Sequence, residues 1–151
     1  MKTRRIISIL ILVLAVMVIS KGYATDEKVS KKDYRFVSGT WINEEYNSYA
    51  FPARWEMRRD GSWDGYNRIS DTGKKYTGHY AIVDNWTDSE GNIWYKMHVW
   101  YGPIDEEHIS GYELDKFSES GKVWEYIADK FAFPTEIDES HPKYHIYYRQ
   151  E

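Results

Sequence analysis

Short β-forming runs separated by glycine turns fill this sequence from Ala53 to its C-terminal end. In the clearest run, residues 93–101, Ile93, Tyr95 and Met97 alternate with Trp94 and Lys96, and such alternation is typical of a half-buried strand. Asp60-Gly61 and Ser120-Gly121 are hairpin signals, because glycine accepts the positive φ that tight β-turns require. The pattern predicts strands in eight segments: 36–43, 53–58, 62–69, 75–83, 93–101, 106–114, 122–127 and 144–149.

This spacing indicates the fold class. No segment of useful length has a helical period, and short strands at regular spacing with turn signals favour a sandwich or a barrel. The tight turns favour hairpins between consecutive strands. We therefore predict an all-β fold: a single antiparallel up-and-down, or meander, β-barrel of about eight strands that closes and removes its edges.

The N-terminal segment is typical of a secretory signal peptide. Lys2, Arg4 and Arg5 precede the apolar residues 6–19, and small residues precede a predicted cleavage after Ala24. We therefore expect three parts: a signal peptide in 1–24, a flexible lead-in with at most one short helical turn in 25–35, and a barrel domain in 36–151. The mature chain is expected to be exported, either periplasmic or secreted. An uncleaved N-terminal anchor is the alternative; after cleavage we expect no stable membrane span.

Charge and cysteine content narrow the expected partners. The leader holds four of the 20 basic residues and none of the 24 acidic ones, so residues 25–151 carry a net charge of −8. An acidic chain without a basic cluster repels phosphate backbones, and no nucleic-acid partner is expected. The chain has no cysteine, so the fold depends on its core without disulfides. We expect a monomer.

The first and last predicted strands carry a resemblance to a known superfamily. Gly39-Thr40-Trp41 near the start and Arg149 near the end resemble the glycine-x-tryptophan and closing-arginine pattern of the calycins, which include lipocalins and fatty-acid-binding proteins. The resemblance implies that Trp41 plugs one end of the barrel and that Arg149 crosses its ring in a cation–π contact. The disulfide, the C-terminal helix and the Thr-Asp-Tyr motif of secreted lipocalins are missing, so the chain resembles a compact bacterial lipocalin-like protein.

Aromatic residues make up 17% of the chain, which suits a β core and also suits a pocket for a planar or apolar ligand. By analogy with lipocalins we predict an exported barrel that binds a small apolar or aromatic ligand. The alternative is a protein-interaction or structural barrel with a filled interior and an exposed aromatic patch around Trp94 and Trp100. The predicted ligand-binding residues share one apolar face by alternation: Trp55, Met57, Tyr80, Tyr95, Met97, Tyr144 and Ile146.

Catalytic and metal chemistry have weaker signals. Nothing forces the five histidines to converge, and we predict no metal site and no cofactor, although a haem-binding calycin would use a histidine such as His145. Nucleophile elbows, phosphate loops and paired-carboxylate motifs are absent from the sequence. We expect no enzyme and no catalytic residue. The alternative is a lyase similar to phenolic acid decarboxylases, for which the candidate residues are Tyr80, Tyr95, Glu113 and Arg54.

Overall fold

The computed structural model describes residues 29–44 and 52–151 of this chain as one helix and eight strands. The predicted signal peptide in 1–24 and the first residues of the lead-in lie outside the described residues. The elements are α2 (Lys31–Val37), β1 (Gly39–Ile42), β2 (Arg54–Met57), β3 (Ser62–Tyr66), β4 (Tyr76–Thr87), β5 (Ile93–Tyr101), β6 (Gly111–Phe117), β7 (Val123–Asp129) and β8 (Tyr144–Arg149).

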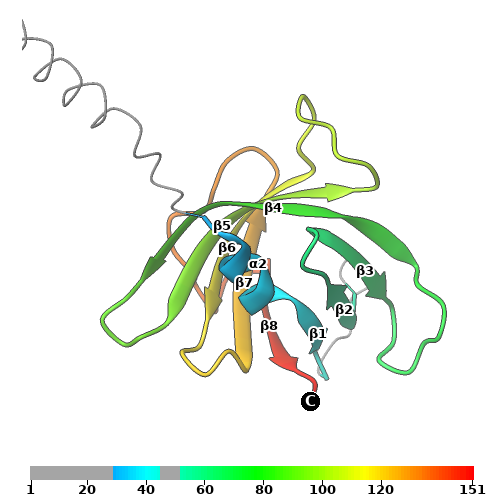
Figure 1. Cartoon of the computed structure of the whole chain (residues 1–151), viewed down its shortest axis with the longest axis horizontal. Coiled ribbons are helices and arrows are strands. Elements are labelled where there is room, and N and C mark those ends of the chain that lie inside the picture. Colours follow the sequence, from blue (N-terminus) through cyan, green and yellow to red (C-terminus); the bar gives the residue numbers. More distant parts are fainter. Residues whose placement is uncertain (1–28, 45–51) are drawn as a thin grey trace, which may run out of the picture.

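The strands form a closed antiparallel barrel in chain order (Figure 1). Each strand pairs with the next, and β8 returns to β1, where Trp41 is opposite Arg149 and Ile42 is opposite Tyr148. The prediction of an all-β meander barrel of about eight strands is confirmed. Closure of the described strands removes the open sheet edges to which another chain could add a strand.

Several strand boundaries differ from the predicted ones. β4 continues to Thr87 through residues predicted to be a polar loop, because a change of register between Ile82 and Asp84 keeps the ladder paired with β5. β6 begins at Gly111, and the residues before it form a turn. Phe36 and Val37, predicted to begin the first strand, belong instead to α2.

Helix α2 overlaps the lead-in 25–35, for which at most one short helical turn was predicted; its seven residues make about two turns. Ser30 caps the helix: its Oγ accepts a hydrogen bond from the Lys32 amide, and Asp33 accepts one from the Ser30 amide. This reciprocal capping box satisfies two donors that a helix N-terminus otherwise leaves free. The Tyr34 ring stacks on Tyr80 at 5.5 Å, which fixes the helix against the barrel.

The two ends of the barrel differ. We call the end covered by α2 the capped end; the turns β2–β3, β4–β5 and β6–β7 lie there, because connections alternate between ends in a meander. We call the other the loop end. It carries the connections 67–75, 102–110 and 130–143, of which the last two rise at the top of Figure 1.

Candidate functional site

The capped end is built around Trp41, Arg149 and Gly39. The Arg149 guanidinium carbon lies 4.3 Å from the Trp41 ring centroid, and the Trp41 indole donates to the Val37 carbonyl at 3.0 Å. A Cβ at Gly39 would lie 2.6 Å from Arg149 Nη1, so a larger residue would displace the guanidinium. The three residues for which the resemblance implied barrel closure are therefore in mutual contact.

Arg149 also ties three separate segments together. Its guanidinium donates to the carbonyls of Phe36, Ser38 and Gly121, at 2.6, 2.7 and 2.7 Å respectively. These carbonyls come from α2, from the residue after it and from the β6–β7 turn. A planar guanidinium with several fixed donors suits this arrangement better than an ammonium group does. All three guanidinium nitrogens of Arg149 thus donate a hydrogen bond at the capped end.

The predicted ligand-binding residues fall on both faces of the sheet. Trp55, Met57, Tyr80, Tyr95 and Met97 point into the barrel and are buried. Tyr144 and Ile146 lie on the outer face, opposite Ile127 and Glu125, and the Tyr144 hydroxyl donates to Glu125 at 2.9 Å. The prediction that all seven share one face is wrong, because β8 turns its alternate residues, such as Tyr147, inward.

The centre of the barrel is filled by aromatic rings. The Trp124 ring centroid lies 4.9–6.3 Å from the centroids of five neighbours: Trp41, Trp55, Phe117, Tyr126 and Tyr147. Trp55 is itself 4.5 Å from Trp63. Edge-to-face and offset contacts at these distances are the packing of a protein core. The five inward residues of the predicted ligand set therefore belong to the packed interior.

A pocket of about 230 Å³ lies at the loop end, lined by the following residues of β5–β8 and their connections: Val99, Tyr101, Ser110, Gly111, Glu113, Ala128, Asp129, Lys130 and Lys143. Val99 and Ala128 supply apolar walls. The Tyr101 ring is 48% exposed at the rim. Glu113 is only 8% exposed and is the one buried acid of this set.

Glu113 is unusual because its carboxyl group makes no hydrogen bond or ion pair with any described residue. Two residues along the same face of β6, Asp115 is fully buried; its Oδ1 accepts a hydrogen bond from the Trp124 indole at 2.8 Å. Burial raises the pKa of Glu113 well above its ordinary value, and the nearby Asp115 carboxyl raises it further. Burial likewise raises the pKa of Asp115, while the Trp124 hydrogen bond opposes that rise.

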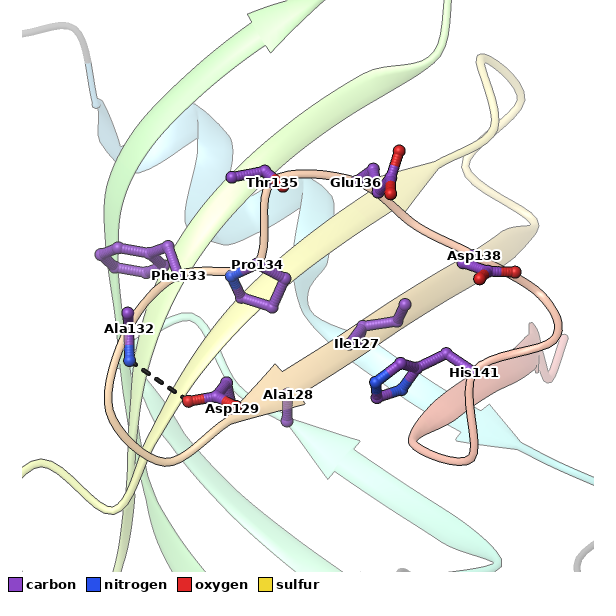
Figure 2. A pocket seen from close by; sticks show the side chains of 10 residues that line it. All are labelled: Ile127, Ala128, Asp129, Ala132, Phe133, Pro134, Thr135, Glu136, Asp138 and His141. Carbon is purple, nitrogen blue, oxygen red and sulfur yellow. Dashed lines mark hydrogen bonds between the residues drawn. The ribbon is translucent and has the colours of Figure 1, made fainter.

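A second pocket of about 440 Å³ lies under the connection between β7 and β8 (Figure 2). Two of its three acids, Asp129 and Asp138, hold the loop itself. Asp129 accepts hydrogen bonds from the Phe131 and Ala132 amides, at 2.8 and 3.3 Å, and Asp138 accepts from the Ser140 amide and hydroxyl. The Phe133 ring stacks on His98, on the outer face of β5, at 5.2 Å. Asp129 and Asp138 therefore have a structural role in the loop, whereas no hydrogen bond gives Glu113 such a role.

Metal and catalytic sets do not assemble in the part of the chain that the structure describes. Among residues 29–44 and 52–151, no three His, Asp or Glu side chains converge in a way that would hold a metal ion. Of the residues proposed for a lyase, Arg54 lies on the outer face, its guanidinium 3.8 Å from the Tyr66 ring centroid, while Glu113 points inward. The expectation that the protein is not an enzyme stays a prediction. No helix in the described segments has the length and apolarity to cross a membrane.

Sequence reasoning named Glu113 only for the lyase alternative and missed Asp115. Alternation places Glu113, Asp115 and Phe117 on one face of β6, and Tyr112, Leu114 and Lys116 on the other. A face with two acids looks solvent-exposed. A usable signal was Phe117 two residues after Asp115, because an inward Phe117 brings both acids inward with it.

Comparison with known proteins adds no assignment to this geometry. No family model, curated protein or solved structure matches the chain. The argument for function therefore depends on the barrel and on the contrast between its filled centre and its loop-end pocket. Fold alone does not determine function, and the site must carry the inference.

Proposed function

We propose that this chain is an exported binding protein that holds a small polar molecule in the loop-end pocket. The observation that carries the proposal is the buried Glu113 carboxyl, which lines a pocket of about 230 Å³ and has no hydrogen-bond partner among the described residues. Buried polar groups in proteins are nearly always paired, and an unpaired one that borders a pocket is a candidate ligand contact.

The filled centre argues against carriage of a large apolar ligand in the middle of the barrel. Trp41, Trp55 and Trp124 occupy the space that a fatty acid or a retinoid would need. Interiors packed with rings at these distances do not open without loss of many dispersion contacts. A ligand at the loop end needs no such rearrangement.

We also propose that the barrel is of the lipocalin type. The support is the Gly39, Trp41 and Arg149 arrangement at the capped end, in which the guanidinium lies 4.3 Å from the indole centroid. The predicted leader supports export, to the periplasm or beyond the cell. Neither proposal assigns a ligand.

The test is a binding screen that follows backbone amide chemical shifts of the chain. Small polar metabolites are expected to shift resonances of β6 and of the 102–110 and 130–143 connections. Fatty acids and retinoids serve as the apolar comparison and are expected to leave the spectrum unchanged. Saturable shifts from the apolar set at residues such as Trp55 and Met97, with none from polar molecules, would overturn the proposal.

Protein recognition is a second candidate function. Phe131 is 82% exposed and Ile104 is 55% exposed, on the two connections that border the loop-end pocket, whereas Trp100, predicted for an exposed aromatic patch, is buried. Large apolar side chains that face solvent together mark contact surfaces more often than single ones do. The test is whether F131S and I104S lose a partner that wild type binds with a measured affinity, while small-molecule binding is kept.

A further inference from the structure

The pocket at the loop end combines a buried acid with two exposed lysines. Glu113 lies at its buried side, while Lys130 and Lys143 line it from the exposed 130–143 connection. Neither lysine is held in a tight ion pair with a described residue: Lys143 Nζ is 3.9 Å from Asp129 Oδ2, and Lys130 Nζ lies 5.7 Å from the Phe131 ring centroid. The pocket thus offers a buried acid inside, and two ammonium groups beside the half-exposed Asp129 carboxylate outside.

A second buried acid, Asp115, lies two residues from Glu113 on the same face of β6. Its Oδ1 binds the Trp124 indole, but its Oδ2 is buried without a hydrogen-bond partner among the described residues. Leaving a buried polar group unpaired costs on the order of 1–3 kcal/mol, and Asp115 Oδ2 carries such a cost. Glu113 is 8% exposed to the pocket, where a ligand that donates hydrogen bonds can satisfy its acceptor oxygens.

The charges restrict the ligand in both directions. A simple cation has to pass two lysine ammonium groups, which the single Asp129 carboxylate at the mouth of the pocket balances only in part. A simple anion is attracted by the lysines but leaves the Glu113 carboxyl group without a hydrogen-bond donor. A molecule with an ammonium at one end and a carboxylate at the other satisfies both sets of groups, since charge complementarity favours matched partners and penalises like charges.

We propose that the loop-end pocket binds a small zwitterion, with its ammonium group at Glu113 and its carboxylate at Lys130 and Lys143. The inference rests on the proposed function and specifies its ligand class. A cavity of about 150 Å³ holds a benzene molecule, so about 230 Å³ suits a molecule of amino-acid size. Val99, Ala128 and the Tyr101 ring supply an apolar wall for its side chain.

The test uses three probes that share one skeleton and differ in charge. Phenylalanine is the zwitterion, phenethylamine lacks the carboxylate, and 3-phenylpropionate lacks the ammonium. Affinities are measured by titration calorimetry on the full mature chain at neutral pH. Phenylalanine is expected to bind at least tenfold more tightly than either partner, since one charged hydrogen bond is equivalent to about 10–100-fold in affinity.

Two variants separate the ends of the ligand. E113Q keeps the shape of the side chain but replaces the carboxyl group that a bound ammonium would ionise, and is expected to weaken phenylalanine and phenethylamine binding by about 10–100-fold while leaving 3-phenylpropionate binding unchanged. The double variant K130Q/K143Q is expected to weaken phenylalanine and 3-phenylpropionate binding but not phenethylamine binding. E119Q, an exposed acid in the β6–β7 turn at the capped end, is the matched control and should change nothing.

The outcomes distinguish this inference from the proposed function. Equal affinity for the three probes, or phenylalanine binding that E113Q leaves intact, overturns the zwitterion inference. If 3-phenylpropionate alone binds and shifts loop-end resonances, the pocket functions but the ligand class is wrong. If none of the three binds at millimolar concentration, the inference fails; if the whole polar screen is also silent, the proposed function fails with it.

Discussion

The two ends of this barrel treat buried polar groups in opposite ways. At the capped end, Arg149 donates to three backbone carbonyls and covers Trp41, and the Trp41 indole donates to Val37. At the loop end, Glu113 has no hydrogen bond to a described residue, and two residues further along β6 towards the centre of the barrel Asp115 Oδ2 has none either. The first end is built for closure, whereas the second has an acid without a hydrogen-bond partner beside a pocket.

The contrast indicates that the capped end serves stability and that the loop end is available for recognition. The buried polar groups at the capped end are hydrogen-bonded, so they stabilise the fold without leaving a buried charge unpaired. Unsatisfied groups at the loop end lower stability and are retained where they have another use. Substitutions at the capped end should therefore destabilise the fold, while neutralising the loop-end acids should stabilise it at higher pH.

The largest effect is expected for Trp41→Ala. The ring is completely buried and contacts Phe117 and Trp124, with centroids at 5.3 and 5.7 Å. Removing a buried tryptophan leaves a cavity and should lower the free energy of unfolding by about 3–5 kcal/mol. Urea unfolding followed by fluorescence measures it. A loss below about 1 kcal/mol would mean that the capped end does not depend on this ring.

Arg149→Ala is the next prediction, with an expected loss of about 1.5–3 kcal/mol from the charged hydrogen bonds alone. Arg149→Lys is the control: it keeps the charge but cannot reach three carbonyls with a planar fork, so it should recover little stability. A double-mutant cycle with Trp41→Ala should give a coupling energy of about 0.5–3 kcal/mol. Strictly additive losses would contradict the contact between the two side chains.

A resemblance and position in the chain together made the capped end predictable. Gly39, Trp41 and Arg149 were identified because they resemble the calycin pattern, and they fit a barrel because the first and last strands are neighbours in any closed meander. The same parity explains the error in β8. Since Arg149 faces inward, residues 147 and 145 must face inward too, which excludes Tyr144 and Ile146 from the interior.

Helix α2 was missed because its apolar residues are too few to show a period. The available signal was local: Ser30 followed three residues later by Asp33 is a capping box that precedes Tyr34, Phe36 and Val37. Tertiary contacts to Tyr80 and Tyr95 then stabilise a helix that would not form alone.

The loop end was harder to predict because its inward strand face is acidic. Leu114 and Ile127 lie on the outer face of β6 and β7 and are nevertheless buried. The long β7–β8 connection covers this outer face, since a pocket lies between the connection and β7 and Phe133 stacks on His98. Both faces of these strands are therefore partly buried. Alternation alone does not say which face is the interior when both are covered.

The pH dependence of stability tests the loop end. The raised pKa values mean that folded Glu113 and Asp115 retain protons that the unfolded chain, with ordinary pKa values of 4.5 and 3.8, has released. Their contribution to stability therefore falls as pH rises from the ordinary pKa values towards the raised ones, by at most about 1.4 kcal/mol per pH unit for each proton.

His145 opposes this fall at lower pH, because burial lowers its pKa from 6.5 to about 4 and the unfolded side chain then binds the extra proton. The fall should be clearest from about pH 7 upward, where unfolded histidine is mostly neutral.

The matched variants for this slope are E113Q, D115N and the control E119Q. The asparagine introduced by D115N can still accept the Trp124 hydrogen bond through its carbonyl oxygen, so this variant removes the titrating proton without removing the contact. Each of the first two should flatten the loss of stability above about pH 7, measured by urea unfolding at each pH. A wild-type curve that stays level, or an E113Q curve parallel to it, would contradict the proposal that these acids are held neutral.

The smallest predicted effect compares one serine at each end. Ser30→Ala removes the Oγ that accepts from the Lys32 amide and caps α2, and should cost about 1 kcal/mol. Ser140→Ala removes the hydroxyl that donates to Asp138 in the exposed 130–143 connection, and should change stability by less than about 0.5 kcal/mol. The measurement is thermal unfolding of both variants beside wild type. Equal losses would mean that α2 is no more tightly coupled to the barrel than a surface loop is. The distinction between a closing end and a recognising end would then depend on Trp41 and Arg149 alone.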